Sequence, residues 1–139
     1  MAESARLAEV ARRVDECVAM LHAQSGLRPW HVTDTECLDA GFPYYREEHG
    51  RLFYRVQEKG RTLREDVVDD VEELVHLVMV DLVSEVAGAY ELAHRRKGED
   101  TRRQWFHLTE AWLTAMDPRW GALERERQAL ILRAYPFSS

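Results

Sequence analysis

Apolar residues recur every three or four positions near the start of the chain, which is the period of an amphipathic helix. The apolar stripe consists of Leu7, Val10, Ala11, Val14, Val18 and Leu21. Gly26 follows it, and glycine commonly ends a helix because it adopts the left-handed conformation without strain. We therefore predict an N-terminal helix over residues 3–24.

In residues 44–65 this pattern is replaced by side chains that alternate between two faces with a period of two. Two turn sequences, His49-Gly50 and Lys59-Gly60, separate short runs that are rich in aromatic and β-branched residues. Such turns favour tight hairpins, so the segment predicts a three-stranded antiparallel meander. Leu52, Tyr54 and Val56 would share the packed face.

Residues 27–43 have no clear period. Pro29, Gly41 and Pro43 interrupt any regular element, and residues 30–37 fit either a strand or an ordered loop.

The longest apolar helix is predicted to begin at Asp69 or Asp70, either of which can cap it. Its apolar positions are Val71, Leu74, Val75, Val78, Leu82, Val86, Ala89 and Ala93. The opposite side is apolar as well between Leu74 and Val83, so this helix should be covered on more than one face. We place it at the centre of the fold, with its end near residues 94–97.

Two further helices follow, each with a recognisable start. Gly98 should break the chain, Asp100 should cap the next helix, and Asp117-Pro118 should cap and open the last one. The expected apolar face of the first is Trp105, Leu108, Trp112, Leu113 and Met116, and that of the second is Trp120, Leu123, Leu130, Ile131 and Ala134.

The predicted fold class is therefore α+β. An N-terminal helix is followed by a small antiparallel meander and by three helices, residues 69–134, packed around the long central helix. At 139 residues, the chain has the usual size of one domain, so we expect a single domain over 1–139.

Composition narrows the class of protein. The sequence is 45% hydrophobic and 32% charged, as in ordinary globular proteins, and no segment is apolar over the roughly 18 residues that a membrane span needs. Cys17 and Cys37 lack the close spacing of a zinc site or disulfide framework, which fits a cytoplasmic protein. The net charge of −6 argues against nucleic acid and favours a basic protein partner.

Two carboxylates on the long helix are candidates for chemistry. Glu85 falls inside the predicted apolar stripe, where a carboxylate must be paired or neutral. Glu91 and His94 have the spacing found in carboxylate-bridged di-metal bundles, whereas Glu91 and Arg95 have that of a helical ion pair. We expect a structural polar network of Glu85, Glu91, His94, Arg95, Asp100 and Arg103, with no metal, cofactor or catalytic residue.

An acidic run precedes the long helix and continues into its first turn. It consists of Glu65, Asp66, Asp69, Asp70, Glu72 and Glu73. Its carboxylates can complement the helix dipole, and they can also form a landing surface for a basic partner. The residues expected to contact such a partner are Asp66, Asp69, Asp70 and Glu73.

The order of residues in the last two-thirds of the chain, from Tyr44 onward, resembles immunity protein family 63 of bacterial polymorphic toxin systems. The residues that carry the resemblance are Tyr44-Tyr45, Asp70, Leu74, Tyr90-Glu91-Leu92, His94-Arg95, Asp100, Arg102-Arg103, Phe106, Pro118, Trp120 and Tyr135-Pro136-Phe137. The resemblance implies a small cytoplasmic protein that binds and neutralises a cognate toxin, without enzymatic activity.

Two alternatives stay open at this stage. One is a non-catalytic structural or regulatory adaptor, and the other is a small metal-binding helical enzyme that uses His76, Glu85, Glu91 and His94. We expect no nucleic acid or membrane partner, and either a monomer or a weak homodimer formed through exposed aromatic residues such as Trp30 and Phe137.

Overall fold

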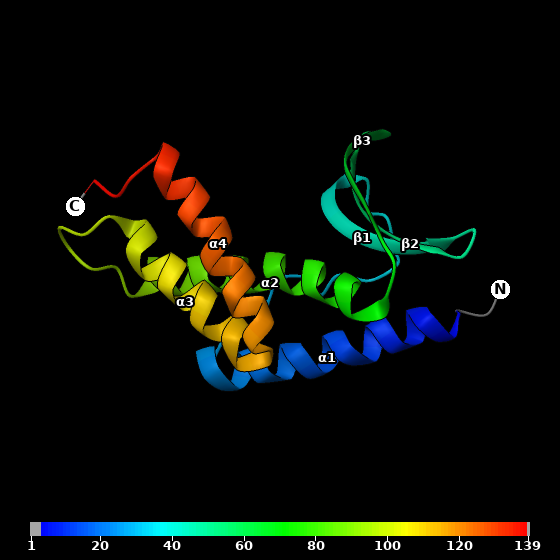
Figure 1. Cartoon of the computed structure of the whole chain (residues 1–139), viewed down its shortest axis with the longest axis horizontal. Helices are drawn as coiled ribbons and strands as arrows, with labels where there is room; N and C mark the ends of the chain where they lie inside the picture. The colour runs from blue at the N-terminus through cyan, green and yellow to red at the C-terminus, as the bar shows by residue number, and fades with distance from the viewer. Residues whose placement is uncertain (1–3, 139) are drawn as a thin grey trace. The chain divides into compact units, whose positions relative to one another are not determined.

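The computed structural model describes residues 4–138 and has four helices and three strands there (Figure 1). In chain order they are α1 (Ala5–Ser25), β1 (Ala40–Glu48), β2 (Arg51–Glu58), β3 (Arg61–Val68), α2 (Val71–Ala93), α3 (Thr101–Met116) and α4 (Pro118–Ala134). The predicted α+β class, with one helix, a meander and three helices, is confirmed. The predicted first residue of α1, Glu3, lies outside the described residues.

The chain divides into two compact units. We call the first the sheet unit (Met1–Glu16 and Trp30–Met79) and the second the helical unit (Cys17–Pro29 and Val80–Ser139). Helices α1 and α2 each contribute one part to each unit. The assignment of 1–139 to a single domain stays a prediction.

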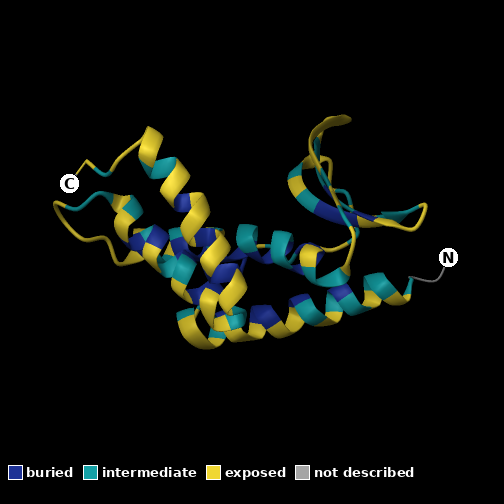
Figure 2. Cartoon of the chain, in the orientation of Figure 1, coloured by how far each residue is buried: buried dark blue, intermediate teal, exposed yellow. Residues whose placement is uncertain are grey.

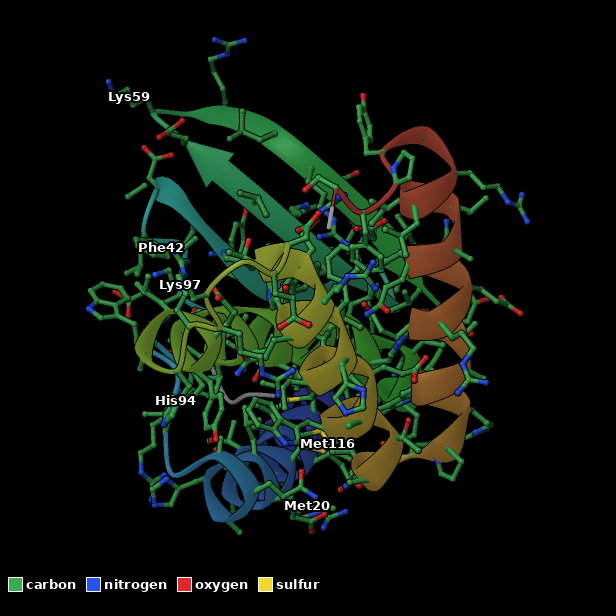
Figure 3. All side chains as sticks on the ribbon, turned by 90° about the vertical axis from the view of Figure 1, so that its left-hand side faces the viewer. Met20, Phe42, Lys59, His94, Lys97 and Met116 are labelled. Atoms are coloured by element: carbon green, nitrogen blue, oxygen red, sulfur yellow. The ribbon has the colours of Figure 1, made fainter. Side chains whose placement is uncertain are left out.

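The sheet is an antiparallel meander in the order β1-β2-β3. Both predicted turns are confirmed, because His49 and Gly50 have φ of 53° and 76°, and Lys59 and Gly60 have φ of 50° and 76°. Two consecutive left-handed residues make the turn that matches the twist of paired strands. Lys59 stands at the tip of the second turn (Figure 3).

The sheet is longer than the predicted 44–65. Its first strand begins at Ala40 and includes Pro43, and the pairing register shifts between these two residues. Proline is tolerated there because β1 is an edge strand and the ladder is already irregular at this point. Residues 30–37 form an ordered loop, held where the Tyr45 N–H donates to the Asp34 carbonyl oxygen at 3.0 Å.

One face of the sheet supplies much of the core of the sheet unit. Tyr45, Leu52 and Tyr54 are each no more than 2% exposed, and Val56 is half-buried on the same face. Val10 and Val14 of α1 are buried as well. Figure 2 shows the buried stretches of β1 and β2, whereas β3 is exposed along most of its length.

Helix α2 begins with a side-chain cap, as expected. The Glu73 N–H donates to Asp70 Oδ1 at 2.8 Å, and the Asp69 N–H donates to Glu73 Oε2 at 3.2 Å. Of the two candidates, Asp70 is therefore the cap. The helix ends at Ala93, just before the predicted end near residues 94–97, and Gly98 has the left-handed φ of 79°.

The caps of α3 and α4 are confirmed, whereas the expected buried faces of these helices are confirmed only at Trp112, Leu113 and Trp120. Asp100 and Asp117 each accept a hydrogen bond from the N–H two residues on, and Pro118 opens α4. The residues that α3 buries are Gln104, Phe106, Thr109, Trp112 and Leu113. The residues that α4 buries are Trp120, Gly121, Glu124 and Gln128.

The prediction for α4 was wrong beyond Trp120. Leu123 and Leu130 are 49% and 63% exposed, so their side chains lie outside the core. The physical reason is that the buried side of α4 is polar, and a search for apolar positions selects the opposite side. On α3, Trp105, Leu108 and Met116 are only half-buried.

The close approach of α3 and α4 near their connection yields a testable prediction. A Cβ on Gly121 would lie 2.8 Å from Thr114 Cβ and 3.0 Å from Thr114 Cα, and it would overlap Thr114 Oγ1. We expect Gly121→Ala to destabilise the protein by about 1–3 kcal/mol through overpacking. The free energy of unfolding, measured in urea, checks this.

Gly88→Ala is the matched control. A Cβ there would meet Trp105 Nε1 at 3.5 Å, an ordinary contact, so alanine should be neutral or stabilise α2 by up to about 1 kcal/mol. Equal effects of the two substitutions would contradict the close packing at Gly121.

Candidate functional site

The acidic run before α2 is largely engaged in local contacts. Asp66 forms an ion pair with Arg64 at 2.6 Å, and Asp70 and Glu73 accept the capping hydrogen bonds described above. Asp69 is exposed, and its backbone oxygen accepts a hydrogen bond from Arg6 Nη2 at 3.0 Å. All four predicted contact residues lie in one short segment of the sheet unit, and Asp69 is the one whose carboxylate neither caps the helix nor pairs with Arg64.

A charged ladder crosses all three strands of the sheet. Arg55 on β2 pairs with Glu48 on β1 at 2.9 Å and with Glu65 on β3 at 2.7 Å, and its guanidinium lies 4.3 Å from the centre of the Phe53 ring. The hydrogen bonds that Arg55 donates to Glu48 raise the pKa of Arg55 and lower the pKa of Glu48. These cross-strand pairs hold the register of the sheet.

The predicted polar network as a whole stays a prediction, although several of its members make defined contacts. Glu91 is 6% exposed and accepts two hydrogen bonds from Arg95, at 2.9 and 3.2 Å, which raises the pKa of Arg95. The helical ion pair considered for these two residues is therefore present. His94 stacks on Tyr90 with ring centroids 4.1 Å apart, and its Nδ1 lies 3.0 Å from the Tyr90 carbonyl oxygen.

The expectation that Glu85 is buried was wrong, because this residue is exposed. The buried positions on this part of α2 are Leu82, Val83, Val86, Ala87 and Glu91. Glu85 lies off that row, and so do Ala89 and Leu92, which are also exposed. The carboxylate that the helix buries is Glu91.

Asp100 joins the chain after α4 to the start of α3. Its carboxylate accepts hydrogen bonds from Arg102 Nη2 and from the Ser138 N–H, both at 3.0 Å. Arg103 contacts a different group, with its guanidinium 4.2 Å from the centre of the Phe137 ring. Phe137 is thus half-buried within the helical unit.

A buried polar cluster lies between α3 and α4 and was not predicted from the sequence. Glu124 is 2% exposed and accepts from Arg127 at 2.6 Å and from Gln128 Nε2 at 2.7 Å. Gln128 Nε2 also donates to the Phe106 carbonyl oxygen at 2.9 Å. The spacing of Glu124, Arg127 and Gln128, three and four residues apart, is the sequence feature that could have indicated it.

Aromatic side chains lie at the surface of the sheet unit. Trp30 and Phe42 stack with ring centroids 5.0 Å apart and planes inclined by 21°, and they are 75% and 36% exposed. Figure 3 labels Phe42 on β1. Of the two aromatics considered for self-association, Trp30 is exposed and Phe137 is not.

The alternative of a metal centre receives no support from geometry. Within residues 4–138 no group of three or more His, Cys, Asp or Glu side chains is arranged to hold a metal ion. Glu91 and His94, the pair with metal-like spacing, contact Arg95 and Tyr90 instead.

The two units differ in charge. The sheet unit has 16 acidic and 9 basic residues, a net charge of −7, and the helical unit has 9 acidic and 10 basic residues, a net charge of +1. The negative charge of the whole chain therefore resides in the sheet unit, and any attraction for a basic partner is concentrated there.

Comparison with known proteins identifies the family. Residues 48–129 match the family model described as Immunity protein 63, which spans more than half of the chain, and the protein belongs to this family. The matched segment runs from the end of β1 into α4 and confirms the resemblance inferred from the sequence. No curated protein and no solved structure matches the chain. Across residues 4–138, no helix is both long and apolar enough to span a membrane.

The contacts of Asp100 predict how stability depends on pH. The hydrogen bonds from Arg102 and Ser138 hold the pKa of Asp100 far below its ordinary value of about 3.9. A depressed carboxyl pKa stabilises the folded state above the unfolded pKa, and that stability is lost as the pH falls toward the folded pKa. We expect Asp100→Asn, which keeps an oxygen for the cap, to be less stable than the native protein at pH 7.

The difference in the free energy of unfolding between the native protein and Asp100→Asn should narrow steadily as the pH is lowered from about 4 to 2. Urea unfolding of both proteins across this range measures it. Glu126→Gln, at an exposed position on α4, serves as the control and should show no such pH dependence. A deficit in Asp100→Asn that stays constant across the range would exclude the proposed charge interaction.

Proposed function

We propose that this protein is an immunity protein that binds a cognate bacterial polymorphic toxin and neutralises it by protein–protein contact. The observation that carries the proposal is its membership of the Immunity protein 63 family. On this proposal the protein acts in the cytoplasm of the producing cell, as a monomer or weak homodimer, and without catalysis. The mode of action is occlusion, in which the bound protein covers the toxin's active site or its substrate-binding surface.

The charge distribution supports a basic toxin as the partner. Exposed carboxylates steer a cationic protein during the diffusional encounter and raise the association rate. The acidic run supplies such carboxylates, and we propose Asp66, Asp69, Asp70 and Glu73 as its landing surface. Asp70 and Glu73 also cap α2, so they act through charge without leaving their structural role.

Co-expression tests the proposed function directly. Each toxin domain encoded near this gene in its source genome is expressed with and without this protein, and growth is scored. Rescue from one toxin, together with a complex on size-exclusion chromatography, is the expected result. If every neighbouring toxin stays lethal and forms no complex, the function assigned here is wrong and a role as an adaptor for another protein gains weight.

Charge reversal at Asp69 tests the landing surface. We expect Asp69→Lys to lower the association rate by about 3-fold to 10-fold at low ionic strength, with the effect fading as salt screens it. Stopped-flow or surface-plasmon measurements of the association rate across a salt series check this.

Glu126→Lys is the matched control, because it makes the same change in net charge at an exposed position in the helical unit. It should alter the association rate much less than Asp69→Lys. Equal effects would mean that net charge alone, and not the acidic run, steers the toxin.

A further inference from the structure

A small hollow opens in the sheet unit. Its volume is about 230 Å³, and it is lined by Ala11, Val14 and Asp15 of α1, by residues 32–34 of the loop before β1, and by Tyr45 of β1. The loop is fixed against the sheet because the Asp34 carbonyl oxygen accepts the Tyr45 N–H at 3.0 Å. Three separate segments thus hold the walls of the hollow in place.

Two carboxylates at this hollow lack a cationic partner in the described part of the chain. Asp15 and Asp34 are exposed, and neither forms an ion pair. Asp34 Oδ1 accepts the Glu36 N–H at 2.8 Å, which orients the side chain and leaves its second oxygen available. Many other carboxylates of the same unit are paired with arginine, namely Glu9, Glu16, Glu47, Glu48, Glu65, Asp66 and Glu72.

A third polar group in the hollow is also unused. Thr33 is 3% exposed, yet none of the hydrogen bonds within residues 4–138 involves its hydroxyl. The Thr33 oxygen is not among the fully buried side-chain atoms that lack a partner, so it remains accessible from the hollow. An unpaired hydroxyl that lines a hollow points to a hydrogen-bonding group that enters from outside.

The chemistry of the walls selects the kind of group that fits. Ala11, Val14 and Val32 present apolar surface, whereas the two carboxylates and the Thr33 hydroxyl offer acceptors for N–H groups. Arginine and lysine side chains combine an apolar stem with a cationic, donor-rich head, so they can place the stem against the apolar wall and the head at the carboxylates. The volume suits a single side chain better than a whole ligand, for which pockets of about 300–1,000 Å³ are usual.

We propose that this hollow is an anchor site that receives an arginine or lysine side chain from the toxin. The inference rests on the proposed function and adds to it the residues that hold the bound partner. The net charge of −7 on the sheet unit favours a basic protein surface as the source of that side chain. The acidic run would then act on encounter, and the hollow on retention.

The deciding experiment is a calorimetric titration of this protein with the toxin domain that it neutralises in the co-expression test. The double variant Asp15→Asn/Asp34→Asn removes both charges, changes little in shape, and keeps the Asp34 oxygen that accepts the Glu36 N–H. We expect its Kd to rise by about 10-fold to 100-fold, mainly through faster dissociation, because a cation in the hollow loses both counter-charges. Thr33→Val, which removes only the hydroxyl, should raise the Kd by a smaller factor.

Glu36→Gln/Glu58→Gln is the matched control. Both positions are exposed in the sheet unit outside the hollow, and the change in net charge is the same. This control should alter the Kd by less than about 3-fold. If the double variant at the hollow binds as tightly as the control, the anchor site is refuted while the immunity function stands.

Three further outcomes also support or overturn the proposed anchor site. If no neighbouring toxin binds or is neutralised by the native protein, the proposed function and the anchor fall together. If light scattering shows a homodimer that Asp15→Asn/Asp34→Asn dissociates, a second copy of this chain occupies the hollow and the toxin does not. Should that variant fail to fold, Ala11→Leu fills the hollow at unchanged charge, and the same comparison with the control applies.

Discussion

The burial of α2 is the constraint on which the rest of the structure depends. Its buried residues come in adjacent pairs four positions apart, namely Leu74 and Val75, Val78 and Met79, Leu82 and Val83, and Val86 and Ala87. Each fully buried aliphatic side chain of this size contributes roughly 1.5–3 kcal/mol, so these pairs outweigh any single polar contact in the molecule. The first half of this row belongs to the sheet unit and the second half to the helical unit, so one helix supplies core residues to both.

The same row of pairs explains where reading the sequence succeeded and where it failed. Beyond Val75 the predicted stripe followed single positions and reached Ala89 and Ala93, which placed Glu85 inside it. The actual row continues to Glu91, four residues beyond Ala87, and the helix buries that carboxylate beside Arg95. Because one residue turns a helix by about 100°, a small error in choosing the stripe moves a carboxylate from the core to the surface.

Local features were easier to predict than tertiary ones. The caps at Asp70, Asp100 and Asp117 depend on a side chain and an N–H two or three residues apart, so the sequence alone indicates them. The buried face of α4 depends on what α3 presents to it, and Glu124 and Gln128 are buried only because Arg127 and the Phe106 carbonyl satisfy them. A pattern of apolar positions contains no such information.

The candidate site likewise has one part that the sequence alone indicated and one part that depends on the tertiary fold. The acidic run is continuous in the sequence and was found there, whereas the hollow combines α1, a loop and β1, three segments that only the fold brings together. Residues 30–37 had no period from which to place them, so neither Thr33 nor Asp34 could be assigned a role.

The carboxylates of the sheet unit have two physical roles that the net charge alone does not distinguish: some hold the sheet together through ion pairs, and others attract cations from outside. Paired carboxylates such as Glu48 and Glu65 are partly neutralised by Arg55 at contact distance, so they contribute to the register of the sheet more than to the field outside it. Carboxylates without a cation act differently, because no adjacent positive charge offsets their field, which salt screens over roughly 8–10 Å.

A basic partner that approaches the sheet unit would be attracted mainly by these unpaired groups, and it would gain most at a place where the approaching cation also leaves water. The hollow at Asp15 and Asp34 offers that combination of charge, apolar wall and an unused hydroxyl. Asp69 in the acidic run is exposed and does not line this hollow, so its charge is expected to act mainly at a distance. Attraction over distance and retention on contact are therefore expected to rest on different carboxylates of the same unit.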